Sequence, residues 1–242
     1  MSSFIPFDDD VQRLGHYVYT GEDSPLSSKL ANKAQTRLIH EAILNLPESS
    51  SLLDIGCGDG TYTNDFLALK IGKIVGIDLS EGGIQSAKKN YESTTKNLEF
   101  YCESLEDHTA RGFRYDIAVL RGVIHHAEDP ADLIAGVAHI ARYLIISDPN
   151  GLNPVLKVIE KVSPYHIEHQ EKSFTPKTIR HWLNAGDFEL KSTKVGVLVP
   201  FFAPSFLAKV LNSLQKAVEQ IPLARWVLCG TQVHTASSRK SE

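Results

Sequence analysis

A short apolar run that carries a carboxylate and leads into a glycine-rich turn most constrains what this chain can fold into. Residues 51–55 have the pattern of a buried strand with Asp54 near its end, and Gly56, Gly58 and Gly60 follow before a helical pattern begins. Glycine tolerates positive φ and has no Cβ, so backbone can lie against a ligand, and a helix N-terminus favours negative charge. The pattern predicts a strand, a turn and a helix that together hold a small anionic group.

A second carboxylate, Asp78, ends the next strand-like run at residues 73–77. It lies about 20 residues past the middle of the turn, where an acid in a strand–helix–strand unit can bind both hydroxyls of a ribose. The pyrophosphate of NAD favours the wider spacing Gly-x-Gly-x-x-Gly, whereas the third glycine here comes one residue earlier. These features predict a nucleoside ligand with an anionic tail.

The length and net charge of the chain limit its number of domains and its classes of partner. The chain has 242 residues and a formal net charge of −4, with no basic run longer than Lys88-Lys89. This length suits one large α/β domain, and the acidic balance makes nucleic acid a poor partner. The three cysteines are far apart and lack metal-ligand spacing, which is typical of a reducing compartment, and we expect a cytoplasmic location. We expect neither a secretory signal nor a transmembrane segment.

Strand and helix patterns alternate around the turn. Short β runs occur at 51–55, 73–78, 98–102, 115–120 and 143–147, and helical patterns occur at about 25–46, 60–69, 81–92 and 130–141. Strands separated by helices imply right-handed crossovers and a parallel sheet with helices on both faces, the Rossmann-like doubly wound α/β fold. Ligands of such sheets bind beyond the carboxyl ends of the strands, where the strand order reverses. The glycine turn is expected to border that point.

The alternation stops after Gly151. A stretch marked by proline and histidine follows at 152–173, and then we expect a helix at about 176–184, strands at 188–199 and 225–235, and a flexible tail at 237–242. An inserted segment, 200–224, separates those two strands and contains an amphipathic helix, 205–219. Residues 1–24 form an arm that either packs its aromatic rings on the domain or acts as a lid. The domain itself is expected to span 25–236.

The chain resembles the class I S-adenosylmethionine-dependent methyltransferases. The resemblance rests on four motifs in order: Asp54 to Gly60, Asp78, Cys102-Glu103-Ser104, and residues 116–126. It covers roughly residues 50–150, and it implies S-adenosylmethionine as cofactor, S-adenosylhomocysteine as product, and a mostly parallel seven-stranded sheet whose last strand is antiparallel. The expected final strand pair suits that sheet, but its two strands usually form a near hairpin, and here the inserted helix lies between them.

The same resemblance implies which residues bind the cofactor. The glycines of the turn would line its methionine part, Asp78 would hold the ribose hydroxyls, and the segment after the third strand would meet the adenine. The full expected set is Asp54, Gly56, Cys57, Gly58, Gly60, Asp78, Leu79, Glu103, Ser104, Arg121 and Gly122, with the last two beside the sulfonium. Two alternatives stay open, because Asp54 can cap the helix turn and Glu103 can be an ordinary solvated carboxylate.

Methyl transfer from a sulfonium depends mainly on positioning, and a base is needed only if the acceptor must lose a proton. Histidine titrates in the useful range, so His125, His166 and His169 are the candidate bases, with His169 preferred. Hydrogen-bonded loop histidines are the alternative for each. On the substrate or lid side we expect four residues: Tyr17, Tyr19, His126 and Asn150.

The spacing of His166, Glu168, His169 and Glu171 also suits a divalent metal ion if the segment is helical. Flanking prolines favour a loop there, so we expect no metal. The chain has neither an Asn-Pro-Pro-Tyr tetrad nor a Pro-Cys pair, which argues against methylation of nucleic-acid bases. We therefore expect transfer to oxygen or nitrogen, less so to carbon, of a small-molecule or lipid-like acceptor. The alternative is a non-catalytic protein of the same fold that binds the cofactor or its product as a sensor or partner subunit.

The inserted helix has an apolar stripe at positions 207, 210, 211, 214, 217 and 218. Packing of this stripe on the domain, or over the substrate pocket, is the first expectation. A homodimer contact through residues 205–219 is possible, and contact with a membrane surface is the least favoured reading because the helix has few basic residues.

Overall fold

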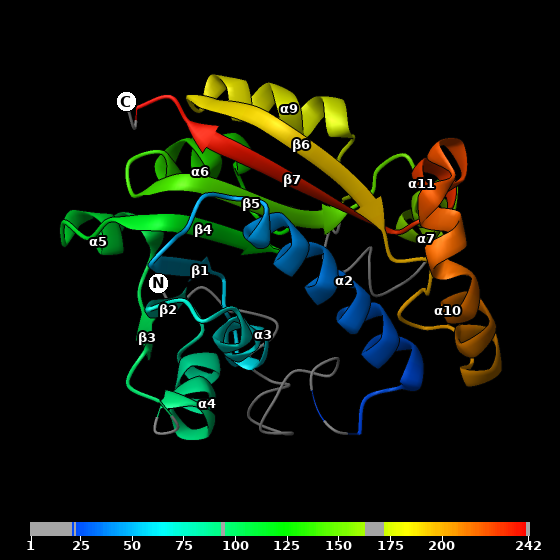
Figure 1. Cartoon of the computed structure of the whole chain (residues 1–242), viewed down its shortest axis with the longest axis horizontal. Coiled ribbons are helices and arrows are strands. Elements are labelled where there is room, and N and C mark those ends of the chain that lie inside the picture. The colour runs from blue at the N-terminus through cyan, green and yellow to red at the C-terminus, as the bar shows by residue number, and fades with distance from the viewer. Residues whose placement is uncertain (1–20, 22, 93–94, 163–171, 241–242) are drawn as a thin grey trace.

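The computed structural model describes residues 21, 23–92, 95–162 and 172–240. Its centre is a seven-stranded sheet in the order β3-β2-β1-β4-β5-β7-β6 (Figure 1). The strands are β1 (Ser51–Ile55), β2 (Lys73–Asp78), β3 (Leu98–Cys102), β4 (Tyr115–Arg121), β5 (Ala141–Pro149), β6 (Phe188–Gly196) and β7 (Thr231–Ser238).

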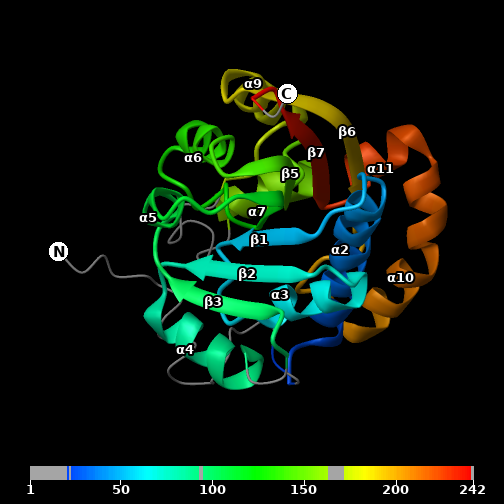
Figure 2. The same ribbon diagram turned by 60° about the vertical axis from the view of Figure 1, so that its left-hand side comes forward.

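Strands β1 to β5 are parallel, and β7 pairs antiparallel with both β5 and β6. The parallel run is clearest in Figure 2, where β1, β2 and β3 point the same way. The strand order reverses between β1 and β4, which are adjacent although β2 and β3 lie between them in sequence. This confirms the predicted Rossmann-like fold with its antiparallel last strand.

Helices cover both faces of the sheet because successive strand residues point to opposite sides. Leu52 belongs to one buried core and Leu53 to the other. The first core packs under α2 (Leu26–Leu44), the short α3 (Thr61–Asp65) with its 3-10 extension η1 (Phe66–Leu69), and α4 (Glu81–Asn90). The second packs under α5 (Leu105–Ala110), α6 (Pro130–Val137) and α9 (Pro176–Ala185).

Local sequence explains where several of these helices begin. Asp129 accepts hydrogen bonds from the first amides of α6, and Pro130 follows at the first helical position. Thr175 and Pro176 repeat this arrangement at the start of α9. Ser80 caps α4 in the same way by accepting from a main-chain amide.

The C-terminal part differs from the sequence-based expectation. Residues 222–228 form a helix, α11 (Pro222–Leu228), so the strand predicted from position 225 was wrong in its first half, and β7 begins at Thr231. A short apolar run has the same composition in a strand and in a buried helix turn, and Pro222 is the one signal of a helix start. Ser237 and Ser238 belong to β7 and pair with β6, whereas we expected a flexible tail to begin at Ser237. Helix α7 (Pro154–Val162) was also missed, within the stretch that we expected to be irregular.

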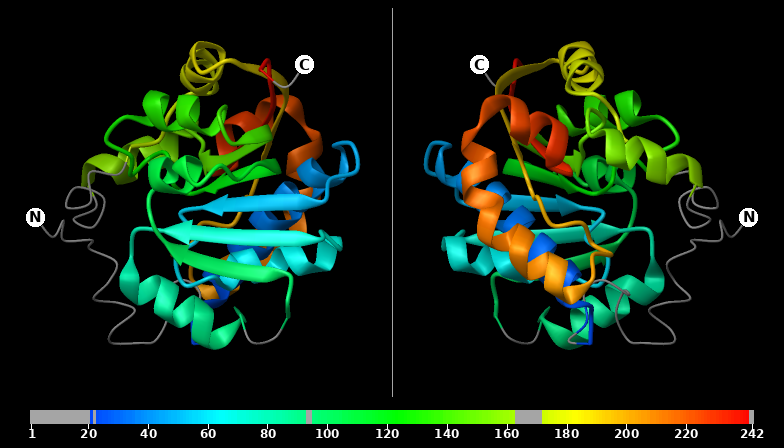
Figure 3. Two further views of the ribbon diagram at one scale, coloured as in Figure 1. Left: turned by 90° about the vertical axis from the view of Figure 1, so that its left-hand side faces the viewer. Right: turned by 90° about the vertical axis from the view of Figure 1, so that its right-hand side faces the viewer.

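The inserted helix is confirmed as α10 (Ser205–Gln220). It packs on α2, α11 and β6 and lies outermost in the right-hand view of Figure 3, in front of α2. None of the described helices is long and apolar enough to cross a membrane. The predicted arm, apart from residues 21, 23 and 24, lies outside the described residues, and its role as a lid stays a prediction.

Candidate functional site

The glycine turn after β1 has the conformation that its sequence requires. Gly56, Gly58 and Gly60 have φ values of +74°, +56° and +77°. A Cβ on Gly56 would lie 2.6 Å from Val123 Cγ2, and one on Gly60 would lie 2.8 Å from Phe100 Cζ. Positive φ and close packing therefore both exclude other residues, and the turn lies directly against the segment that follows β4.

Three main-chain amides of this turn are used within the chain, and the binding of a small anionic group by the turn stays a prediction. Gly56 and Cys57 donate to the carbonyl of Ile77 at 2.8 and 3.1 Å, and the Gly58 amide donates to Asp78 Oδ2 at 2.8 Å. Helix α3 has only 5 residues, so its dipole is small. These three amides are therefore not free to bind an anionic ligand.

The end of β2 presents a carboxylate beside an exposed apolar side chain. Asp78 Oδ1 accepts from the Ser80 amide at 2.8 Å, which fixes the carboxylate at the mouth of the turn. Leu79, the next residue, is 63% exposed. A fixed acid next to an uncovered apolar surface suits a ribose with a planar base, so these residues fit the predicted nucleoside.

Asp54 lies beneath the turn and is almost fully buried. Its Oδ2 accepts from Thr63 Oγ1 at 2.7 Å, which ties β1 to α3. Burial raises the pKa of this carboxyl to about 7, although the bond from Thr63 acts in the opposite direction. The bond to α3 shows the structural contact that was the alternative reading of this residue.

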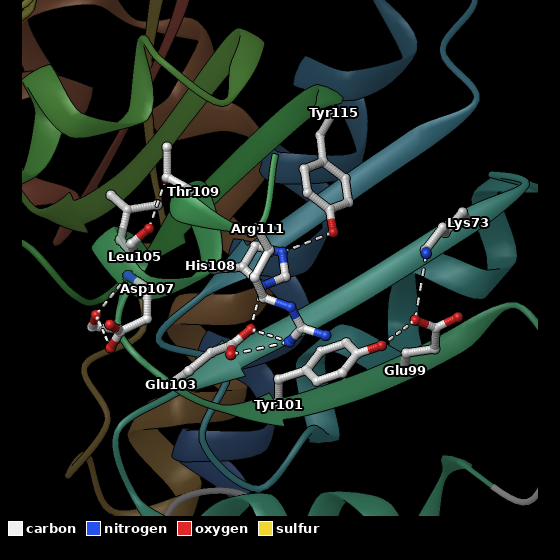
Figure 4. Close-up of polar contacts among 11 residues, drawn as sticks. Lys73, Glu99, Tyr101, Glu103, Leu105, Asp107, His108, Thr109, Arg111 and Tyr115 are labelled. Carbon is white, nitrogen blue, oxygen red and sulfur yellow. Dashed lines mark hydrogen bonds and ion pairs between the residues drawn. The ribbon is translucent and has the colours of Figure 1, made fainter. Parts of the chain in front are cut away.

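Glu103 belongs to a polar cluster at the edge of the sheet (Figure 4). Its Oε1 lies 2.5 Å from Nδ1 of the buried His108, and Arg111 Nη1 donates to both carboxylate oxygens at 2.9 and 3.1 Å. His108 Nε2 lies 2.9 Å from the hydroxyl of Tyr115. Glu103 is thus a fixed, paired carboxylate rather than an ordinary solvated one. The Ser104 side chain accepts a hydrogen bond from the Asp107 main-chain amide and so caps the N-terminus of α5.

Arg121 ends β4 and points toward the helices rather than into the loop after β4. Its guanidinium lies 3.5 Å from the ring centroid of Tyr62 and donates to Thr36 Oγ1 at 2.8 Å and to the Asn32 carbonyl at 3.3 Å. The side chain therefore joins β4 to α2 and α3. Gly122 follows with a φ of +68°, which turns the chain away from the strand.

The segment after β4 brings a histidine against a buried carboxylate. His125 Nδ1 lies 2.8 Å from Oδ1 of Asp148, which is 1% exposed at the end of β5. Because a carboxylate accepts, Nδ1 carries the proton in this pair, and Nε2 is then the accepting nitrogen. The ring of the exposed His126 lies 3.9 Å from that of His125, centroid to centroid. A histidine oriented by a carboxylate is an arrangement suited to a general base.

Asn150 was expected on the substrate side, and its side chain is fully buried. Its amide nitrogen donates to the carbonyls of Trp226 at 2.8 Å and Cys229 at 3.0 Å. These bonds attach the end of β5 to the segment between α11 and β7. These hydrogen bonds give Asn150 a structural role that requires no ligand.

Several predicted site residues lie outside the described part of the chain: Tyr17, Tyr19, His166 and His169. Their roles stay predictions. The metal reading of positions 166–171 lies there too. Among the described residues, no three or more histidine, cysteine or acidic side chains form a group that could hold a metal ion.

A family model described as a methyltransferase domain matches residues 27–193. The chain belongs to this family. The match begins in α2 and ends in β6, so it contains the glycine turn, Asp78 and the His125–Asp148 pair of this methyltransferase domain.

Curated relatives of the methyltransferase domain include enzymes named ubiquinone biosynthesis O-methyltransferase. The one from Coxiella burnetii is 29% identical over 122 residues, which is 50% of each chain. The one from Hydrogenovibrio crunogenus is 33% identical over 96 residues, 39% of each chain. The chain thus spans half the length, or less, of these relatives.

Solved structures share the fold over almost the whole length of the methyltransferase domain. Magnesium protoporphyrin IX methyltransferase from Synechocystis, with bound S-adenosylhomocysteine, is 18% identical with a TM-score of 0.62, covering 95% of this chain and 93% of its own. A Haloferax volcanii methyltransferase in complex with the activator Trm112 is 16% identical with a TM-score of 0.67, covering 98% and 99%. At these identities the likeness concerns the fold.

Sequence reasoning missed Asp148 as the partner of His125 in the methyltransferase domain. The usable signal was its position: it ends β5, the strand next to β4, and the carboxyl ends of parallel neighbours meet at one edge of the sheet. The Arg121–Tyr62 contact was missed as well. No spacing rule links the end of β4 to a helix that precedes β2 and β3 in the chain.

Proposed function

We propose that this methyltransferase domain transfers a methyl group from S-adenosylmethionine to an oxygen, or a nitrogen, of a small-molecule or lipid-like acceptor. Family membership supports the reaction class, and the printed names of the curated relatives favour oxygen. The observation that carries the proposal is the His125–Asp148 pair, which lies at the carboxyl ends of β4 and β5 beside the glycine turn.

The proposed cofactor site uses the features that β1 and β2 bring together. The turn would lie against the methionine part, Asp78 would accept hydrogen bonds from the ribose hydroxyls, and Leu79 would cover one face of the adenine. When bound, S-adenosylmethionine supplies a methyl group on a sulfonium sulfur that leaves as a neutral thioether. We keep Glu103, Ser104 and Gly122 as proposed neighbours of the cofactor, and Arg121 and Asp54 as residues that hold the surrounding turn.

In the proposed reaction, His125 removes the proton of the acceptor. Asp148 holds the ring by its Nδ1–H, so Nε2 takes the proton of a hydroxyl as its oxygen forms the new bond to the methyl carbon. The buried carboxylate then stabilises the charged imidazolium. Asp148 acts here as a positioning residue, since it touches the base rather than the substrate.

Substitution of the pair tests the proposal. With S-adenosylmethionine labelled in its methyl group and a panel of phenols and amines, we expect His125→Ala to lower kcat by about 10²–10⁴-fold on a hydroxyl acceptor. Asp148→Asn should lower kcat less and shift the acid limb of the pH–rate profile. Calorimetry should give both variants the wild-type affinity for the cofactor. Full activity of His125→Ala on hydroxyl acceptors would contradict the assignment of the base.

His139→Ala is the matched control, because His139 is exposed and lies just before β5, at the opposite end of that strand from Asp148, and its activity should stay near wild type. His169→Ala in the same assay tests His169, the base that the sequence favoured. Tight cofactor binding without turnover of any acceptor would instead favour the non-catalytic binding protein. Failure to bind S-adenosylmethionine would overturn both readings.

A further inference from the structure

Helix α10 is anchored to the domain by polar residues and by one edge of its apolar stripe. Glu219 accepts two bonds from Arg37 Nη2, at 2.8 and 2.7 Å, and Gln215 Oε1 accepts from the Leu198 amide at 3.4 Å. Gln215 and Ala208 are the buried residues of this helix. Leu211 and Val218, at one edge of the apolar stripe, pack against buried clusters of the domain, so the expected packing of the stripe is met in part.

The opposite face of α10 is apolar and uncovered. Phe206, Val210 and Leu214 recur at every fourth position and are 80%, 39% and 50% exposed. Of the fourteen large apolar side chains that are exposed among the described residues, eight lie on or between α10 and α11. They are Phe206, Leu207, Val210, Leu214, Ile221, Leu223, Val227 and Leu228, and we call them the apolar platform. A concentration of exposed apolar side chains of this kind marks a surface that binds another protein or a membrane.

The charges around the apolar platform have one sign. Residues 200–230 contain three cations, Lys209, Lys216 and Arg225, and one acid, Glu219, which is paired with Arg37. Lys209 and Lys216 are exposed, and their spacing of seven residues places them on the same flank of the helix. The chain as a whole has a formal charge of −4, so this segment stands out against the average. The surface is complementary to an anionic and apolar one.

We propose that α10 and α11 lie on an anionic lipid surface, with the apolar platform in the boundary of the acyl chains and Lys209 and Lys216 at the phosphate groups. An amphipathic helix with exposed apolar side chains on its outer face and lysines on one flank has the design of an interfacial helix, which rests on a bilayer without crossing it. A second copy of the chain fits less well. Symmetrical pairing through this face would bring lysines toward lysines, and the face has no unpaired acid to meet them.

Co-sedimentation of the full chain with vesicles tests this proposal. We expect binding to vesicles of equal parts phosphatidylglycerol and phosphatidylcholine, and weak or no binding to phosphatidylcholine alone. Lys209→Gln with Lys216→Gln should weaken the partition about 30-fold at low salt, since each lysine near an anionic surface contributes on the order of 1 kcal/mol. Phe206→Ser with Leu214→Ser should weaken it by about tenfold or more, because the buried apolar area is lost.

Lys88→Gln with Lys89→Gln on α4 is the matched control, as it removes the same charge elsewhere and should leave partition unchanged. Thermal unfolding checks that each variant is folded. The proposal is overturned if the wild type fails to bind anionic vesicles or binds neutral ones equally well. It is also overturned if sedimentation shows a dimer that Phe206→Ser with Leu214→Ser dissociates while the wild type ignores vesicles, since a second copy then covers this face.

Discussion

At the scale of single residues, the two acids of the glycine-turn region, Asp54 and Asp78, have different roles, although both belong to the expected cofactor-binding set. Asp54 is buried and bonded to Thr63, whereas the Asp78 carboxylate fastens two main-chain amides at the mouth of the turn. Burial disfavours the charged form of Asp54, whereas Asp78 is held in place by hydrogen bonds from main-chain amides. Asp54 is therefore the residue whose ionisation should be visible in the stability of the protein.

We expect Asp54→Asn to change how stability depends on pH. The pKa of Asp54 in the folded protein is about 7, above its ordinary value, so the folded state holds a proton that the unfolded chain releases between about pH 4 and 7. Stability from this group therefore falls as the pH rises through that window, by up to about 4 kcal/mol. Urea unfolding at several pH values should show this loss in the wild type and not in the variant. If the wild type and the variant show the same dependence of stability on pH, the pKa of Asp54 is ordinary and the prediction is wrong.

At the same scale, the sequence predicted the residues of the turn because their requirement is local. Positive φ and the absence of a Cβ are properties of Gly56 and Gly60 themselves. The availability of the amides was not predictable, because it depends on where Ile77 and Asp78 come to lie. The Asp148 partner of His125 likewise depends on the order of strands in the sheet.

At the scale of elements, most helices and strands with a clear periodic pattern were predictable, whereas a start signal alone was not enough, since α7 begins at Asn153-Pro154 and was missed. Helix α6 begins at Asp129-Pro130 and α9 at Thr175-Pro176, and both were expected. The apolar residues 223–228 match a strand as well as a helix, and tertiary contacts decide between them. The stripe of α10 was found correctly, but periodicity does not reveal which face of a helix meets the domain.

The pairing of β6 with β7 should weaken in acid because of His234. Its ring is buried between Thr193 and Gln232, and burial lowers its pKa to about 4. The unfolded chain takes up a proton below about pH 6.5, so stability is lost as the pH falls, by about 2 kcal/mol at pH 5. His234→Gln should show a smaller loss between pH 7.5 and 5 in urea unfolding. An equal loss in both proteins would assign the acid sensitivity elsewhere.

At the scale of the whole molecule, the doubly wound fold makes one edge of the sheet the place for ligands. Turns after β1, β2 and β4 and the end of β5 meet there, so residues far apart in sequence act together. Sequence spacing gave an expectation for the cofactor side of this edge, and several residues expected on the acceptor side lie beyond the described part. The compartment and the oligomeric state stay predictions.

Cofactor binding should stabilise the entire fold, because the proposed site exists in the folded state alone. At a free S-adenosylmethionine concentration 100 times the Kd, the gain is about 2.7 kcal/mol, and thermal unfolding should shift upward accordingly. Asp78→Ala should weaken binding by about 1–3 kcal/mol through lost charge-assisted bonds, and Asp132→Ala on the exposed start of α6 is the control. A shift with NAD and none with S-adenosylmethionine would refute the cofactor assignment.

The place of β7 has a consequence for the order of folding during synthesis. Strand β6 is made before β7, yet it joins the sheet through β7, which occupies the position beside β5. A nascent chain that has not reached Thr231 therefore keeps the β5 edge open and β6 undocked. Both are free to pair with other chains until the final strand arrives, so a chain that stops before β7 loses two strands of the sheet rather than one.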